Sequence, residues 1–162
     1  MFRRTMVVVL LALVSLSGCG LLDRDEKKEE IERLIEENAQ FSVFLRDDNP
    51  AERKAAVEAR LRTLPDVTTV TFEGHDVAYA KMKKMFAEQN QEMPENFEPE
   101  NLPETFVVKM KDQAAVRNVR DTPLQAELKA LPGVQDLVFT CTTFEECKAD
   151  SIRRRSPAPA AS

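Results

Sequence analysis

Three cysteines and one histidine are the residues of this sequence best suited to covalent or metal chemistry. Cys19 follows the residues Leu-Ser-Gly, a pattern with the form of a bacterial lipobox, where a cysteine is lipidated and becomes the new N-terminus. Two arginines and an uncharged apolar run over residues 6–16 precede it, and this run is shorter than a bilayer span of about 20 residues. We therefore predict a lipoprotein signal peptide over residues 1–18 and a lipid anchor on Cys19 at the extracytoplasmic face of the cell membrane. The alternative is an ordinary secretory signal with an incidental cysteine.

Cys141 and Cys147 form the second cysteine feature. An exported chain meets oxidising conditions, in which such a pair favours a disulfide. Closing so small a loop would stabilise the fold by about 2 kcal/mol before strain and would tie residues 141–150 to the end of the last predicted strand. Redox catalysis is the alternative, but it favours a closer Cys-x-x-Cys pair in a thioredoxin-like context, and the sequence has neither.

His75 is the single histidine. A lone histidine does not supply metal-ligand spacing, and Gly74-His75-Asp76 is typical of a turn after a strand. The four glycines form no phosphate-binding loop, and the sequence contains no GxSxG motif or Cys–His pairing. We therefore predict no catalytic residue, no metal and no cofactor, and a function that is not enzymatic.

The mature chain would be acidic. Loss of two arginines with the signal would leave 21 of 23 basic side chains against 28 acidic ones, a formal charge of −7. An acidic protein is a poor ligand for nucleic acid and for anionic lipid headgroups.

Residues 19–38 are mostly charged and predict a tether, either a short helix or a flexible stalk, with a partner-binding helix as the alternative. Residues 151–162 predict a disordered Pro/Ala-rich tail.

The elements that must carry any site begin with a strand–helix–strand unit between Phe41 and Phe72. Apolar and polar residues first alternate with strand period, but Phe44 adds an apolar side chain to the second face, so both faces are expected to be partly covered. Asn49 is predicted as the N-cap of the helix, with Pro50 at its first position and Glu52 in a capping box. The apolar stripe of the helix consists of Val57, Leu61 and Leu64.

The same unit returns between residues 106 and 139, with Leu128 in the place of Leu61. Thr122-Pro123 lies inside its helical segment, where proline costs about 3 kcal/mol, so we predict a broken helix whose second piece starts with Thr122 as cap. Two such halves predict an α+β fold, the ferredoxin-like split βαβ sandwich with a four-stranded sheet and two main helices on one face. The strands are expected at residues 41–46, 67–73, 105–111 and 134–139. The alternative is two unrelated units with chance similarity.

The connection between the halves is far longer than the short hairpin that this topology needs. A helix is predicted from about Asp76 to Glu88, followed by a Pro-rich acidic stretch, so the connection forms an inserted small helical lobe over about residues 76–102. Methionine is adaptable and suits binding surfaces. We predict that the apolar residues of the lobe form a partner-binding surface, and the alternative is that they form a small satellite core of the lobe. These residues are Met82, Met85, Phe86, Met93, Phe97 and Leu102.

Several of these segments resemble one family. In chain order, SVFLRDD, LPDVTTVTF, YAKMKKMF, LPETFVVKM and LPGVQDLVF are similar to the extracellular domain of FtsX, the permease-like bacterial cell-division protein. The resemblance covers about Gln40 to Phe139, within a domain predicted over residues 39–140. In that family the inserted lobe engages peptidoglycan hydrolases or their adaptors, and the permease pairs with an ATPase to switch them. This sequence lacks the family's four transmembrane helices and has a lipobox instead.

The sequence therefore predicts a membrane-anchored extracytoplasmic lipoprotein that acts as a non-catalytic, protein-binding regulatory module. The resemblance implies a partner among extracytoplasmic proteins, a peptidoglycan hydrolase or its adaptor, in cell division or envelope remodelling. Glutamates around the apolar lobe residues imply that the partner offers basic edges. The alternative is a lipoprotein that senses a small molecule, or acts as a scaffold, through a ferredoxin-like domain.

Overall fold

The computed structural model describes residues 19–94 and 96–155. These residues divide into two units, one formed by 19–35 and 143–155 and the other by Glu36–Thr142, which contains the predicted domain. The predicted signal peptide over residues 1–18 and the last residues of the predicted tail, 156–162, lie outside the described residues. Across the described ranges, no helix combines the length and the apolar character that a bilayer crossing requires.

The first unit contains two charged helices. Helix α2, Cys19–Glu37, occupies the predicted tether, so the tether is helical. Helix α7, Phe144–Arg155, extends into the predicted disordered tail, and that prediction is wrong for residues 151–155. Glu145 and Glu146 lie in the first turn of α7, where their negative charges are favourable to the helix dipole. The two cysteines of the predicted bridge, Cys141 and Cys147, are disulfide-bonded.

The second unit is built on a four-stranded sheet. Its strands are β1 (Gln40–Leu45), β2 (Val67–Glu73), β3 (Thr105–Met110) and β4 (Val134–Phe139), in the order β2-β3-β1-β4. All neighbouring strands are antiparallel, and Val43 at the centre pairs with Phe106 on one side and Leu137 on the other. This order confirms the predicted split βαβ arrangement, in which a strand of the second half lies between the two strands of the first.

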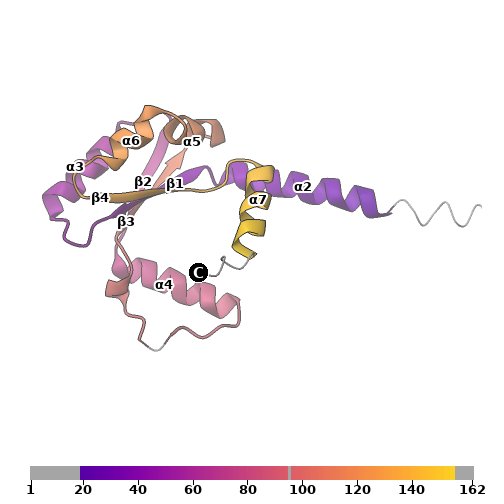
Figure 1. Ribbon diagram of the computed structural model, residues 1–162, viewed down its shortest axis with the longest axis horizontal. Coiled ribbons are helices and arrows are strands. Elements are labelled where there is room, and N and C mark those ends of the chain that lie inside the picture. The colour runs from indigo at the N-terminus through magenta and orange to yellow at the C-terminus, as the bar shows by residue number, and fades with distance from the viewer. Residues whose placement is uncertain (1–18, 95, 156–162) are drawn as a thin grey trace, which may run out of the picture. The chain divides into compact units, whose positions relative to one another are not determined.

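Three helices cover one face of this sheet (Figure 1): α3 (Ala51–Arg62), α5 (Gln113–Arg120) and α6 (Pro123–Lys129). The break predicted at Thr122-Pro123 is present, and the hydroxyl of Thr122 accepts a hydrogen bond from the Leu124 amide at 3.4 Å. Proline at the first helical position needs no amide partner, so the chain restarts there at low cost. The second predicted helix is thus a pair, and α5 buries Val116 and Val119 completely.

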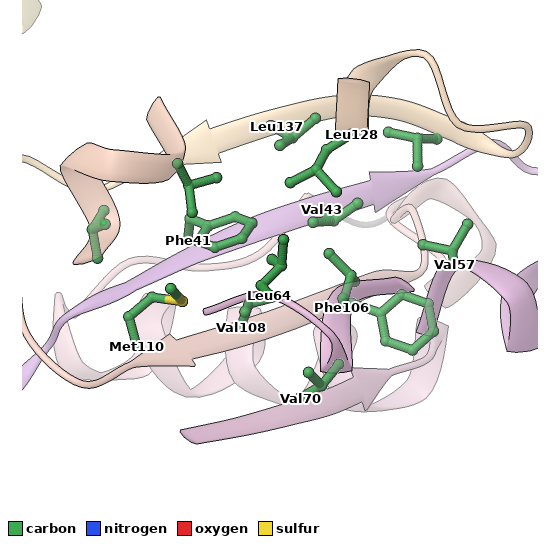
Figure 2. Packing of buried hydrophobic residues seen from close by; sticks show 14 of the residues in the cluster. Phe41, Val43, Val57, Leu64, Val70, Phe106, Val108, Met110, Leu128 and Leu137 are labelled. Atoms are coloured by element: carbon green, nitrogen blue, oxygen red, sulfur yellow. The ribbon is translucent and has the colours of Figure 1, made fainter. Parts of the chain in front are cut away.

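The core lies between these helices and the sheet (Figure 2). Alternate residues of the central strands point into it, Phe41 and Val43 from β1 and Phe106 and Val108 from β3. The two stripe residues predicted to be central are fully enclosed, since Leu61 is 0% and Leu128 1% exposed. The strand period of two and the helical stripe therefore determine which side chains form the core.

Asn49 does not cap α3, contrary to the sequence prediction. Pro50 occupies the N-cap position, and no side chain there provides a capping hydrogen bond, so the predicted capping box with Glu52 is absent as well. The Asn49 amide nitrogen instead donates to the carbonyl of Gly133, 3.0 Å away. The backbone amide of Arg46 donates to the same carbonyl at 3.0 Å. Asn49 therefore binds a buried partner far away in the sequence and does not cap α3. This hydrogen bond joins the loop after β1 to the turn before β4.

The outer strands of the sheet each use a side chain to occupy an outward backbone group. On β2, the guanidinium of Arg62 donates to the Val70 carbonyl at 3.3 Å. On β4, the carboxylate of Asp136 accepts from the Leu137 amide at 2.9 Å and from the Lys129 ammonium at 2.7 Å. The hydrogen bond from Lys129, with a smaller contribution from the Leu137 amide, lowers the pKa of Asp136 from its ordinary value of 3.8.

Candidate functional site

The inserted lobe connects β2 to β3 and consists of helix α4 (His75–Glu88), a loop and the short helix η1 (Pro99–Asn101). Gly74 enters α4 in extended conformation, and Asn90 takes a left-handed backbone (φ 52°) just after the helix ends, as asparagine tolerates well. The Asn101 side chain accepts from the Glu98 amide at 2.8 Å and closes the η1 turn. In Figure 1, α4 lies beyond the sheet on the side away from α3, α5 and α6.

Two polar contacts hold the base of the lobe. The imidazole Nδ1 of His75 lies 2.5 Å from the carbonyl oxygen of Leu102, which joins the first residue of α4 to the chain after η1. Lys81 on α4 forms an ion pair with Glu73, the last residue of β2. The backbone carbonyl of Leu102 is therefore the partner of His75. Within the described part of the chain, no cluster of three or more histidine, cysteine or acidic side chains is arranged to hold a metal ion.

A hollow of about 300 Å³ lies between α4 and the second face of the sheet, and we call it the lobe hollow. On β1, Ser42 and Phe44 alternate with the core residues and therefore point to this second face. Helix α4 contributes Met82 and Met85 from the other side, and Met85 is 46% exposed. The full lining is Ser42, Phe44, Glu73, Ala78, Lys81, Met82, Met85, Leu102, Pro103, Thr105 and Val107.

The lining determines what the lobe hollow can do chemically. Most of it is apolar, so it offers contact to an apolar side chain or alkyl chain. Ser42 and Thr105 add hydroxyl groups, and the Glu73–Lys81 pair adds the charge. The lining therefore offers a largely apolar surface with few polar anchors.

The structure brings together only part of the predicted partner-binding set. Met82, Met85 and Leu102 line the lobe hollow. Phe86, Met93 and Phe97 are half-buried in the lobe and do not belong to this lining. The partner-binding role of all six remains a prediction.

Sequence reasoning missed the half of the hollow that the sheet provides. Phe44 adds an apolar side chain to the second face of its strand, which is the first sequence signal of this half. Val107 stands between two core residues, Phe106 and Val108, so a run of three apolar residues in a strand was the second available signal. Both signals indicate a strand that is covered on both faces.

A second hollow, of about 440 Å³, lies beside the loop after β1 and is lined by Arg46, Asp47, Asp48 and Gln135. These side chains are all polar, and the Arg46 guanidinium already donates to the Val134 carbonyl at 3.2 Å. The lobe hollow is therefore the better candidate for a site that binds through apolar contact, despite its smaller volume.

Comparison with known proteins points in the same direction as the fold. No curated protein matches the sequence. Among solved structures, the chain is similar to extracellular domain 1 of FtsX from Streptococcus pneumoniae in complex with undecyl-maltoside, with 16% identity, a TM-score of 0.50, and coverage of 64% of this chain and 96% of that one. The solution structure of the large extracellular loop of the same protein has 18% identity, a TM-score of 0.44, and coverage of 62% and 97%. At these identities the likeness concerns the fold. The family model of the FtsX extracellular domain matches residues 38–140, more than half of the chain, and the protein therefore belongs to the family of FtsX extracellular domains.

Proposed function

We propose that this protein is a non-catalytic module that binds an extracytoplasmic protein in cell division, and that the partner docks at the lobe hollow. A lipid on Cys19 would anchor it to the membrane. The proposed partner is a peptidoglycan hydrolase or its adaptor. Family membership supports the setting, and the apolar lobe hollow between α4 and the open sheet face is the observation that carries the binding role.

The energetics of the lobe hollow favour a protein partner with an apolar anchor. Met85 is 46% exposed, and burying apolar surface contributes about 25 cal/mol per Å². Methionine also changes rotamer easily, so Met82 and Met85 can adjust to the shape of the incoming side chain. Anchors of this kind in a desolvated centre commonly lose about 2 kcal/mol or more of binding energy on truncation.

Charge around the lobe supports the expected electrostatic character of the partner. Glu88 at the end of α4, Glu92 in the following loop and Glu98 before η1 are exposed. Glu95 is the one lobe position that the structure does not describe. A partner with basic edges would associate faster, and salt would slow that association.

The pneumococcal relative supplies a practical small probe. That domain was solved in complex with undecyl-maltoside, which has an alkyl chain and a sugar head. The apolar lining of the lobe hollow here is compatible with an alkyl chain, so binding of undecyl-maltoside would report on the hollow before the partner is identified.

The test compares two exposed apolar residues of the same helix. Met85 and Val77 are 46% and 47% exposed, but only Met85 lines the lobe hollow. We expect Met85→Ala to weaken binding of undecyl-maltoside, and of a hydrolase or adaptor captured from envelope extract and identified by mass spectrometry, by about tenfold or more. Val77→Ala should bind as the unchanged protein does, and both variants should unfold within about 0.5 kcal/mol of it. Equal binding by both variants would remove the lobe hollow as the site.

Phe86 and Phe97 need a separate experiment because both are half-buried. Calorimetry and partner capture on Phe86→Ala and Phe97→Ala, side by side, separate the two roles. If a variant no longer captures the partner but keeps its melting temperature, the replaced phenylalanine is a binding residue. A lowered melting temperature with intact capture by the folded fraction makes it part of the satellite core of the lobe.

A further inference from the structure

We propose that His75 is a positioning residue that sets the mouth of the lobe hollow. Its imidazole Nδ1 lies 2.5 Å from the Leu102 carbonyl oxygen. Leu102 forms part of the lining of the hollow, and His75 starts the helix that contributes Met82 and Met85 to the same lining. One hydrogen bond thus joins the two segments, α4 and the chain after η1, that supply these residues. The inference rests on the proposed function in one respect, since it takes the lobe hollow to be the partner's site.

The hydrogen bond between His75 and Leu102 joins the two ends of the inserted lobe. His75 and Leu102 are 27 residues apart, and the whole inserted lobe lies between them. Leu102 follows η1 in an extended conformation (φ −100°, ψ 133°). Its amide donates to the Pro99 carbonyl at 3.0 Å, and the bond to His75 holds its carbonyl oxygen. The Glu73–Lys81 ion pair independently ties α4 to the end of β2. Loss of the His75 bond would therefore loosen the wall at Leu102 without detaching α4 from the sheet.

The chemistry of the bond specifies which side chains can replace histidine. A carbonyl oxygen only accepts, so the Nδ1 atom must carry the proton that is donated. Asparagine places its amide nitrogen at nearly the same distance from the backbone as Nδ1, whereas glutamine places it one carbon further out. Asparagine should therefore restore the bond, and alanine and glutamine should not.

A purely local role of His75 predicts the opposite sign. Alanine is a better helix former than histidine, so if His75 served only as the first residue of α4, His75→Ala would leave the helix as stable or make it more so. A positioning role predicts that the same change loosens the lobe, because the Leu102 carbonyl loses its donor.

Amide hydrogen exchange on the full chain tests this, with His75→Ala, His75→Gln and His75→Asn compared with the unchanged protein. In the alanine and glutamine variants we expect amides of α4 and of the segment around Leu102 to exchange up to about tenfold faster, which corresponds to about 1.4 kcal/mol of local opening. The asparagine variant should match the unchanged protein, and amides of β1 and β3 should keep their rates in all three. Unchanged or slower exchange in His75→Ala, or equally fast exchange in His75→Asn, would overturn the proposal.

Binding of undecyl-maltoside by the same variants separates this proposal from the proposed function. If exchange follows the expected order and binding weakens in the same order, both stand. If exchange follows that order while neither His75→Ala nor Met85→Ala changes binding, His75 positions the lobe and the lobe hollow is not the binding site.

Discussion

Gly133 is a position where a single added methyl group should destabilise the whole domain. Its backbone has φ +94°, a conformation that side-chain-bearing residues rarely adopt. A Cβ placed there would lie 2.3 Å from Oδ1, 2.4 Å from Nδ2 and 2.7 Å from Cγ of Asn49. Asn49 is buried and donates to the Gly133 carbonyl, so moving its amide away from the added methyl group would break that buried hydrogen bond.

The magnitude follows from two contributions. A left-handed backbone costs a non-glycine residue about 1–2 kcal/mol. Displacing the Asn49 amide breaks a buried hydrogen bond and leaves its amide nitrogen without a partner, at about 1–3 kcal/mol. Gly133→Ala should therefore lower the free energy of unfolding by about 2–5 kcal/mol, a large part of the total of a domain of this size.

Urea unfolding measures this, with Gly74→Ala as the matched control. Gly74 has φ −79°, and a Cβ there would meet its nearest neighbour, Phe72, at an ordinary 3.6 Å. Because glycine is the better N-cap residue, we expect that control to cost under about 1 kcal/mol. Equal costs for the two alanine variants would refute the reasoning.

A double-mutant cycle isolates the steric contribution. In an Asn49→Ala background the added methyl group has room, so Gly133→Ala should cost only the backbone part, about 1–2 kcal/mol. The Gly133 carbonyl keeps its bond from the Arg46 amide in that background. Fully additive effects would mean that the methyl group and the Asn49 amide do not collide.

Two further predictions concern the core and the anchor. Leu61→Ala and Leu128→Ala remove fully enclosed side chains and should each cost about 2–5 kcal/mol in urea unfolding; unchanged unfolding of both variants would contradict the two-half core. Cys19→Ala should release the protein from membranes or stall its precursor, whereas mass spectrometry that finds an unmodified mature N-terminus at another residue would exclude the lipid anchor.

Local patterns predicted the sheet well because each strand has a distinct buried face. The alternation of Phe41, Val43 and Leu45 placed the first strand within one residue of β1, and the same holds for Phe106 and Val108 in β3. The restart at Thr122-Pro123 was predictable because proline excludes a continuous helix by sterics alone. These features depend on interactions between neighbours in the sequence.

Features that depend on distant partners could not be predicted in the same way. Asn49 looked like an N-cap because capping preferences are local, but its partner, Gly133, is 84 residues away. The methionines of α4 stand out in the sequence, whereas Phe44 and Val107 join the same lining only when the sheet forms and α4 lies over it.

The outer strands have a consequence for how copies of this chain behave at high local concentration. An outer strand with unoccupied outward amides and carbonyls can pair with a strand of another chain. The Arg62–Val70 contact occupies one such group on β2, and the Asp136–Leu137 contact occupies one on β4. At high local concentration, edge-to-edge polymerisation would first have to displace these side chains. The same contacts disfavour addition of a strand from any other protein to either edge of the sheet.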